Sequence, residues 1–359
     1  MPKINLLNLT PADALATLEA FFRDRGEPVY RAGQVARRLW HAPVRSFSEI
    51  TDLPVPLREA LEQSFELPSL RLLTQQLSAD GTRKFLFQLP DGEAIETVSI
   101  PDADRVTICI SSQAGCALQC AFCATGKMGF TRNLEPWEIA GQVRELLLLE
   151  DPVTATNIVF MGMGEPLMNW RAVDVALTLL NDPAALGIGA RHITVSTVGV
   201  LPGIVALGQR PEQFRLAISV HAPTDELRRS LMPINTKYPL REVIEAARTF
   251  DRRVTFEYVM LGGINDRPED ALELARLARE CKAFVNLIPL HPGGAGDFTP
   301  TTADAIRRFG ASLRRAGISV AIRKSRGKDI AAACGQLRVE RHRRRRPVGA
   351  EHDGGVEIA

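Results

Sequence analysis

Apolar residues recur at steps of three and four through the first part of the chain, a spacing that places side chains on one face of a helix. This pattern predicts helices over 12–22, where a Thr-Pro cap signal comes first, and over 31–40. A third short helix is expected over 57–62, after two prolines. Residues 1–70 are therefore predicted to form a small helical domain.

The second predicted helix has a basic face. Arg31, Arg37 and Arg38 alternate there with apolar Val35 and Leu39. Such a face is either solvated or in contact with RNA, and the pattern alone slightly favours solvation.

The periodicity changes to strict alternation after residue 71. Residues 85–89 and 95–100 alternate apolar and polar side chains, and a Pro-Asp-Gly turn separates them. Two alternating runs around such a turn are typical of a β-hairpin. We expect a hairpin linker segment over 71–104.

From Val106 onward one unit repeats, an apolar strand followed by an amphipathic helix. The expected strands cover 106–111, 157–161, 192–197, 214–220, 254–260, 283–290 and 318–323. Alternating strands and helices indicate an α/β fold with a parallel sheet. A partial (β/α)6 barrel over 105–337 is the favoured architecture, and an open doubly wound sheet is the alternative. Both place the chemistry at the carboxyl ends of the strands.

The last segment, 338–359, differs in composition. Six arginines come first and are followed by proline and glycine, a basic, breaker-rich run that we expect to be disordered. It can dock on phosphates or remain a solvated terminus, and the sequence favours neither.

Composition limits the class of protein. The 359 residues are 45% hydrophobic and 24% charged, as in ordinary globular proteins, and the net charge of +2 does not by itself indicate nucleic-acid binding. The chain has no signal-like start and no run of about 18 apolar residues, so we expect a cytoplasmic protein without a membrane partner. Six cysteines are few for a disulfide scaffold and suit a reducing compartment.

Three of those cysteines lie close together. Cys116, Cys120 and Cys123 form a C-x3-C-x2-C motif, with Phe122 just before the last cysteine. A structural zinc site normally has four protein ligands, whereas three thiolates can hold a 4Fe-4S cluster and leave one iron open. The motif favours the cluster, and a zinc loop that borrows a fourth ligand is the alternative.

Further polar residues follow the predicted strands. Gly164 and Glu165 come after the second strand of the repeat, where a glycine lets the backbone approach a ligand and a carboxylate can accept from an ammonium group. Ser196 ends the third strand. Ser219, Val220 and His221 end the fourth. Each alone is more often a satisfied polar group at a strand end.

The cysteine spacing resembles that of the radical S-adenosylmethionine superfamily. Within it, residues 5–337 look like the dual-specificity RNA methyltransferases that modify carbon 2 of adenosine, and the basic tail lies outside the match. The motifs that carry this narrower resemblance are Ser111-Ser112-Gln113-Ala114-Gly115-Cys116, Gly162-Met163-Gly164-Glu165-Pro166, Arg323-Lys324-Ser325-Arg326-Gly327 and Ala333-Cys334-Gly335-Gln336-Leu337.

The resemblance implies substrates, cofactors and partners. The substrates would be an adenosine in the peptidyl-transferase region of 23S rRNA and the adenosine beside the anticodon of certain tRNAs, and the helical front would contact RNA. The cofactors would be a 4Fe-4S cluster and S-adenosylmethionine, used twice per turnover, with a reducing partner such as flavodoxin or ferredoxin.

The resemblance also assigns site residues. Gly164, Glu165, Ser196 and the segment Ser219-Val220-His221 would hold S-adenosylmethionine. His291 stands where the family leads us to expect asparagine at another cofactor-contacting position. A histidine there would make cofactor affinity depend on pH.

Three further residues would be catalytic by resemblance: Cys334 as the carrier of a methyl group, Cys109 as the second catalytic cysteine and Glu96 as a proton acceptor. Carbon 2 of adenine is electron-poor and has no lone pair, so direct transfer from a sulfonium is not available. A methyl radical on Cys334 would add to adenine, and Cys109 would release the product while forming a disulfide with Cys334. Without the resemblance, we would interpret Cys109 as a buried strand cysteine and Cys334 as an inert loop thiol. Cys281 is interpreted as part of the core.

Two other functions remain open at this stage. A related enzyme could methylate carbon 8 of the same rRNA adenosine with the same machinery. A non-enzymatic iron-sulfur module that binds RNA is the second alternative, but it leaves Glu165 and Cys334 without a task.

Overall fold

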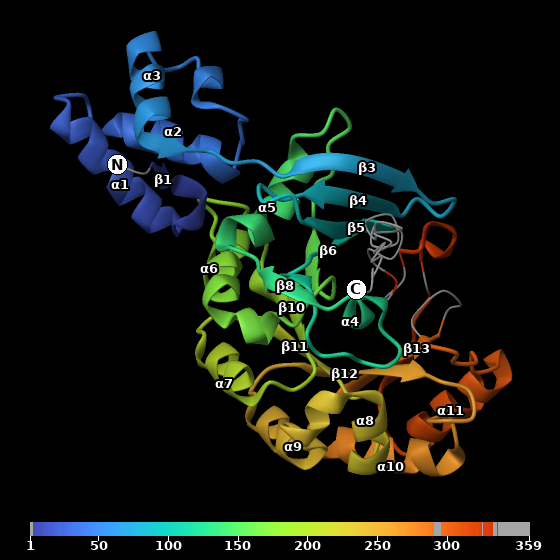
Figure 1. The fold of residues 1–359 in the computed structure, drawn as a ribbon. Coiled ribbons are helices and arrows are strands. Elements are labelled where there is room, and N and C mark those ends of the chain that lie inside the picture. The colour runs from blue at the N-terminus through green and yellow to red at the C-terminus, as the bar shows by residue number, and fades with distance from the viewer. Residues whose placement is uncertain (1–2, 291–295, 325, 333–335, 337–359) are drawn as a thin grey trace, which may run out of the picture.

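The computed structural model describes residues 3–290, 296–324, 326–332 and 336. It consists of a helical unit attached to one large sheet whose outer face is covered by helices (Figure 1). The predicted helices of the front unit are confirmed as α1 (Pro11–Asp24), α2 (Tyr30–Trp40) and α3 (Val55–Ser64). Short strands β1 (Ile4–Asn5) and β2 (Phe65–Glu66) pair in parallel and join the two ends of this unit.

The helical unit docks on α5 (Pro136–Leu147) through a buried arginine. Arg144 donates from Nε to the carbonyl of Leu39 (2.8 Å) and from Nη2 to that of Val44 (2.5 Å). On α2, Arg31 pairs with Glu27 at 3.2 Å and Arg37 is exposed. These contacts leave both interpretations of the basic face open.

The main sheet has ten strands within the described part of the chain, in the order β14-β13-β12-β11-β10-β9-β6-β5-β4-β3. Neighbouring strands are antiparallel from β3 to β6 and parallel from β6 to β14. The strands are β3 (Arg71–Leu77), β4 (Arg83–Gln88), β5 (Ala94–Asp102), β6 (Arg105–Cys109), β9 (Asn157–Phe160), β10 (Ile193–Thr197), β11 (Arg215–Ser219), β12 (Val254–Met260), β13 (Phe284–Pro289) and β14 (Val320–Ile322).

The order of the parallel strands decides between the two predicted architectures. It follows the order of the chain without a reversal, whereas a doubly wound sheet reverses at its switch point. The partial barrel is therefore confirmed. Its other helices are α6 (Trp170–Asn181), α7 (Leu201–Gln209), α8 (Asp225–Leu231), α9 (Leu240–Thr249), α10 (Pro268–Glu280) and α11 (Ala303–Arg315).

The predicted hairpin is present as β4 and β5, and β3 adds a third strand to it. Because β5 also pairs with β6, residues 71–104 form the antiparallel edge of the main sheet, where we had expected a linker. We call β3, β4 and β5 the edge extension. In the described residues, no helix is long and apolar enough to cross a membrane.

Candidate active site

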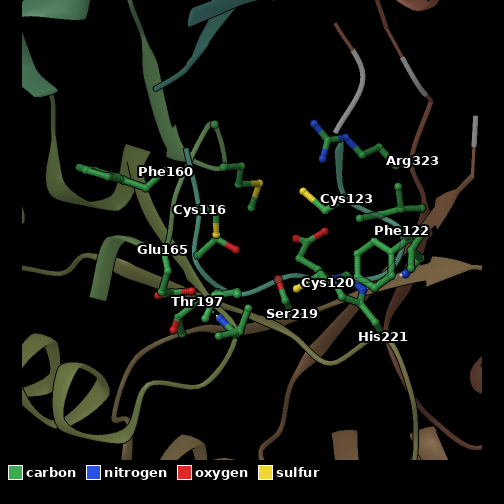
Figure 2. Close-up of a pocket in the computed structure, with 18 of the residues that line it drawn as sticks. Cys116, Cys120, Phe122, Cys123, Phe160, Glu165, Thr197, Ser219, His221 and Arg323 are labelled. Carbon is green, nitrogen blue, oxygen red and sulfur yellow. Dashed lines mark hydrogen bonds between the residues drawn. The ribbon is translucent and has the colours of Figure 1, made fainter. Parts of the chain in front are cut away.

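A cavity of about 230 Å³ opens at the carboxyl ends of the parallel strands. Figure 2 shows side chains from the cysteine loop and from the ends of successive strands surrounding it. Its lining includes all three motif cysteines, together with Gly164, Glu165, Ser196, Ser219 and His221. Most of the predicted cofactor residues thus meet in one place, as expected for strand ends in a barrel.

The cysteine loop is closed at its base by a short ladder. Strands β7 (Gln113–Gly115) and β8 (Phe130–Asn133) pair there, and α4 (Ala124–Lys127) follows Cys123. Gly115 has φ +80°, and a Cβ at this position would lie 2.1 Å from the carbonyl oxygen of Gly129, so the closure requires glycine.

The three thiols have the chemistry of a cluster site. Burial raises the pKa of Cys116 to about 12 and raises that of Cys120 further, so the thiolates need a positive partner such as iron. Among the described side chains, no group of three His, Cys, Asp or Glu residues has the arrangement of a single-ion site. Three thiolates suit a 4Fe-4S cluster with one open iron, whereas a structural zinc site normally has four protein ligands.

The glycine loop after β9 is held by the segment that leads into the cysteines. Gly164 has φ +96°, and a Cβ there would lie 2.5 Å from Cβ of Gln113. The amide of Glu165 donates to Oε1 of Gln113 at 2.9 Å. This close approach fixes the carboxylate of Glu165 relative to the cysteine loop.

Glu165 is almost fully buried. Its carboxylate oxygens accept from the amides of Leu167 (3.0 Å) and Val198 (2.9 Å), but burial outweighs these hydrogen bonds and raises the pKa of Glu165 to about 7. A cationic group in the cavity would stabilise the charged form, so the site suits an ammonium group.

Val220 and His221, which follow β11, differ in their position relative to the cavity. His221 lines the cavity, and burial lowers its pKa to about 3, so the imidazole is neutral. Its Nδ1 accepts from the amide of Val259 at 3.1 Å, which leaves the proton on Nε2 as a donor. Val220 does not line the cavity, and its amide donates to the carbonyl of Glu257 at 3.1 Å.

Two buried charged residues were not predicted from the sequence. Arg228 on α8 is fully buried and donates from Nε to the carbonyl of Val220 (3.2 Å) and from Nη2 to that of Ser219 (3.2 Å). Burial raises the pKa of Cys120, and the positive charge of Arg228 opposes part of that rise, which places a cation near the cysteine loop. No motif marks it.

The second such residue is Glu257 on β12, which lines the cavity. Its Oε2 accepts from Nδ2 of Asn286 at 2.8 Å, and burial raises its pKa. It lies in register with Ser219 on β11. Only the strand alternation could have indicated that its side chain points inward.

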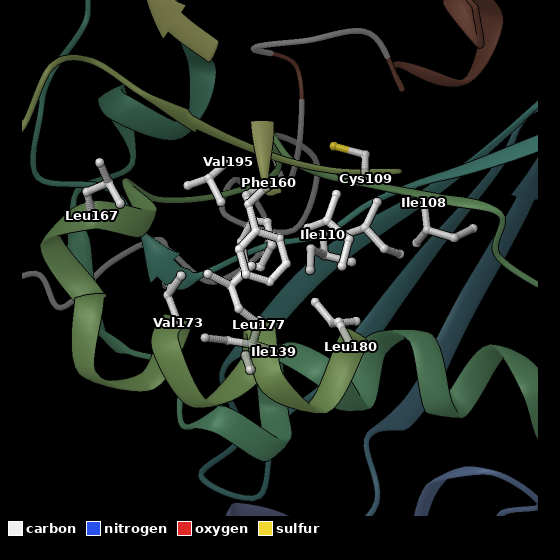
Figure 3. Packing of buried hydrophobic residues seen from close by; sticks show 14 of the residues in the cluster. Ile108, Cys109, Ile110, Ile139, Phe160, Leu167, Val173, Leu177, Leu180 and Val195 are labelled. Atoms are coloured by element: carbon white, nitrogen blue, oxygen red, sulfur yellow. The ribbon is translucent and has the colours of Figure 1, made fainter. Parts of the chain in front are cut away.

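The predicted catalytic residues Cys109 and Glu96 lie on the inner face of the sheet. Figure 3 shows Ile108 and Ile110 pointing toward the helices and Cys109 pointing to the opposite side. Cys109 is the cross-strand partner of Val98, which is two residues from Glu96 on β5 and therefore shares its face. Both residues are buried, and Glu96 pairs with Nζ of Lys84 at 3.5 Å.

Other predicted residues lie outside the described part of the chain. These are His291, Cys334 and the tail 338–359, together with any disulfide between Cys334 and Cys109.

Comparison with known sequences defines the family. Residues 110–277 match the radical SAM superfamily, and residues 4–67 match the ribosomal RNA large subunit methyltransferase N-terminal domain. The chain is 67% identical over 355 residues, 99% of both proteins, to a probable dual-specificity RNA methyltransferase RlmN of Gemmatimonas aurantiaca. It is 47% identical to the dual-specificity RNA methyltransferase RlmN of Anaeromyxobacter dehalogenans, over 93% of this chain and 92% of that protein.

A solved structure agrees with these matches. The crystal structure of a radical SAM methyltransferase from Sphaerobacter thermophilus has 44% sequence identity and a TM-score of 0.87, and the match covers 94% of this chain and all of that one. With the cysteine loop, the buried glutamate and this fold in one chain, the protein belongs to the RlmN family of dual-specificity RNA methyltransferases, within the radical S-adenosylmethionine superfamily.

Proposed function

We propose that this enzyme methylates carbon 2 of adenosine in two RNAs, the peptidyl-transferase region of 23S rRNA and tRNA next to the anticodon. The observation that carries the proposal is the common inner face of Cys109 and Glu96, a face shared by Ile100 of β5, which lines the cavity together with the three motif cysteines. The name of the Gemmatimonas aurantiaca relative, which states dual specificity, supports two kinds of RNA substrate.

Cys116, Cys120 and Cys123 would hold the cluster. When bound, the cluster supplies the electron that splits S-adenosylmethionine into methionine and a 5′-deoxyadenosyl radical. Glu165 would accept from the ammonium group of that cofactor, with Gly164 leaving room for it.

The remaining cavity residues would hold the nucleoside part and the carboxylate. Ser196, Ser219 and Nε2 of His221 supply hydrogen-bond donors at the cavity wall. Glu257 is an acceptor beside Ser219 and suits a ribose hydroxyl. We propose His291 as a further contact, and Val220 would act indirectly, because its amide donates to the carbonyl of Glu257 and its carbonyl accepts from Arg228.

In the proposed reaction, Cys334 loses its proton and takes a methyl group from a first S-adenosylmethionine. A second S-adenosylmethionine would supply the 5′-deoxyadenosyl radical that removes one hydrogen from that methyl, and the resulting carbon radical on Cys334 would bond to carbon 2 of adenine. The adduct would then return one electron to the cluster held by Cys116, Cys120 and Cys123 and give up the carbon-2 proton to Glu96, with Cys109 assisting the proton loss. Finally the Cys109 thiolate bonds to the Cys334 sulfur, the carbon–sulfur bond breaks, and the released methylene takes a proton to become the methyl product.

Two partners complete the proposal. The electron would come from a small reductant such as flavodoxin or ferredoxin, and the disulfide formed at the end of each turnover must also be reduced. Because ribosomal RNA and tRNA are cytoplasmic, we place the enzyme there.

Nucleoside mass spectrometry tests the product. Cells that lack the endogenous enzyme are supplied with the wild-type protein or with Cys334→Ala, and their 23S rRNA and tRNA are digested. We expect 2-methyladenosine in both RNAs with the wild type and in neither with the variant. Appearance of 8-methyladenosine would overturn the carbon-2 assignment.

A further inference from the structure

A short segment near the end of the described chain is fastened to the edge extension. Ser78 Oγ donates to Oδ1 of Asp329 at 2.5 Å, and the amide of Gly327 donates to Oδ2 of Asp80 at 2.9 Å. Gly327 has φ +63°, and a Cβ there would lie 2.9 Å from Cγ2 of Thr82, so the contact requires glycine. We call residues 326–332 the fastened segment.

One buried side chain joins this segment to the proposed proton acceptor. The Nζ atom of Lys84 lies 3.5 Å from Oε1 of Glu96 and donates to the carbonyl of Ala331 at 3.3 Å. The side chains of Lys84 and Glu96 are 8% and 7% exposed. A buried ammonium rarely occurs without such partners, so both contacts are part of how Lys84 is accommodated.

Strand register places this lysine in the same cross-strand row as Cys109, with Val98 between them. Lys84 on β4 and Cys109 on β6 are both cross-strand partners of Val98 on β5, so the three side chains form one row on the inner face. Ala331 is three residues before Cys334 in the sequence. One ammonium group thus contacts Glu96 and the chain leading to Cys334, on the face that carries Cys109.

We propose that Lys84 is a positioning residue, which holds the Glu96 carboxylate and, through the Ala331 carbonyl, the segment leading to Cys334 in register on the inner face of the sheet. The inference rests on the proposed function for the roles of Glu96 and Cys334. The tether itself rests only on the contacts of Lys84 with Glu96 and with the Ala331 carbonyl.

The matched variants are on neighbouring residues of β4. Lys84→Met removes the charge and keeps the apolar stem, and Lys84→Arg restores a charge. Arg83→Gln is the control, because Arg83 faces away from this row and pairs with Asp151 at 3.0 Å. Cluster absorbance and melting temperature confirm that each variant folds.

The first measurement is alkylation of thiols in the full-length, cluster-loaded protein under anaerobic conditions, read by peptide mass spectrometry. We expect iodoacetamide to label Cys334 about tenfold faster in Lys84→Met, because a charged hydrogen bond that restrained the segment is gone. Labelling of Cys281 should not change. Lys84→Arg and Arg83→Gln should label as the wild type does. Equal Cys334 labelling in the wild type and Lys84→Met would overturn the tether.

The second measurement is RNA methylation, with Glu96→Gln and Cys334→Ala assayed in parallel. Lys84→Met should methylate RNA at least about tenfold more slowly while still cleaving S-adenosylmethionine, and Lys84→Arg should recover most of the rate. If Glu96→Gln and Cys334→Ala lose methylation and Lys84→Met does not, this inference alone fails. If Glu96→Gln or Cys334→Ala methylates normally, the proposed function fails as well, whatever the labelling shows.

Discussion

The two halves of the active site are held in different ways. In the cofactor half, buried side chains bind backbone groups of adjoining strands, as Glu165 and Arg228 do. In the other half, the fastened segment meets the edge extension through polar contacts of residues about 250 positions apart, such as Ser78 with Asp329. Buried networks are rigid, whereas partly exposed contacts open at low cost. The cofactor half thus rests on buried contacts, whereas the fastened segment combines partly exposed contacts with one buried ammonium, that of Lys84.

The cluster ligands give the largest expected effect on the cofactor half. Substituting any of Cys116, Cys120 or Cys123 with alanine should abolish the visible absorbance of the cluster and all RNA methylation, because three thiolates are the minimum that holds a cubane. Both are measured on protein reconstituted with iron and sulfide. Cys281→Ala is the control and should keep both. Retention of cluster and activity in any one ligand variant would contradict the assignment.

The Cys109→Ala variant should separate early from late chemistry. The cluster ligands and Cys334 remain, so the carbon radical can still bond to adenine, but no thiol is left to attack the Cys334 sulfur. We expect RNA to accumulate on the protein as a nuclease-sensitive shifted band in denaturing electrophoresis, with peptide mapping placing the adduct on Cys334.

A double variant that also lacks Cys334 is the control for that band, which should disappear. Normal release of product by Cys109→Ala would return Cys109 to a packing role.

Glu165 should make the cofactor-free protein less stable as pH rises. Its pKa is about 7 when folded and near 4.5 when unfolded, so between these values the folded state binds more protons and the free energy of unfolding falls with increasing pH. The decline should be at most about 3 kcal/mol. Glu165→Gln should remove it, as measured by urea unfolding at pH 5 and pH 8. Exposed Glu242 is the control, and a Glu242→Gln variant with the same loss of pH dependence would argue against the assignment.

The smallest expected effect lies in the contacts between the fastened segment and the edge extension. Hydrogen bonds from Thr82, Gly327 and Ser78 outweigh the opposing effect of burial and lower the pKa of Asp80 to about 2. Asp80→Asn should cost about 1 kcal/mol of unfolding free energy at pH 6.

The Asp80 difference should disappear as pH falls from 4 toward 2, since the wild-type carboxylate is then protonated as well. Urea unfolding at both ends of this range measures it, with Asp104→Asn as the exposed control. If Asp80→Asn lost more unfolding free energy at pH 2 than at pH 4, the stabilising role of the Asp80 charge would be contradicted.

The sequence by itself determined the elements and the chemistry of the cofactor half. Strands and helices are indicated by patterns of period two and 3.6, which are local, so a strand such as β12 could be predicted with its bounds. The cysteine motif is local as well, because its three cysteines lie within eight residues. The alternation of strands and helices favoured a partial barrel, and the strand order in the structure decided between it and an open doubly wound sheet.

Only the tertiary structure decided which distant residues meet. The pairing of β5 with β6 turned an expected linker into the edge of the sheet and placed Glu96 on the face of Cys109. Lys84, Arg228 and Glu257 carry no motif, because their roles depend on burial and on partners that the chain supplies from other strands and loops. Register and burial are products of folding, and composition or spacing along the chain does not contain them.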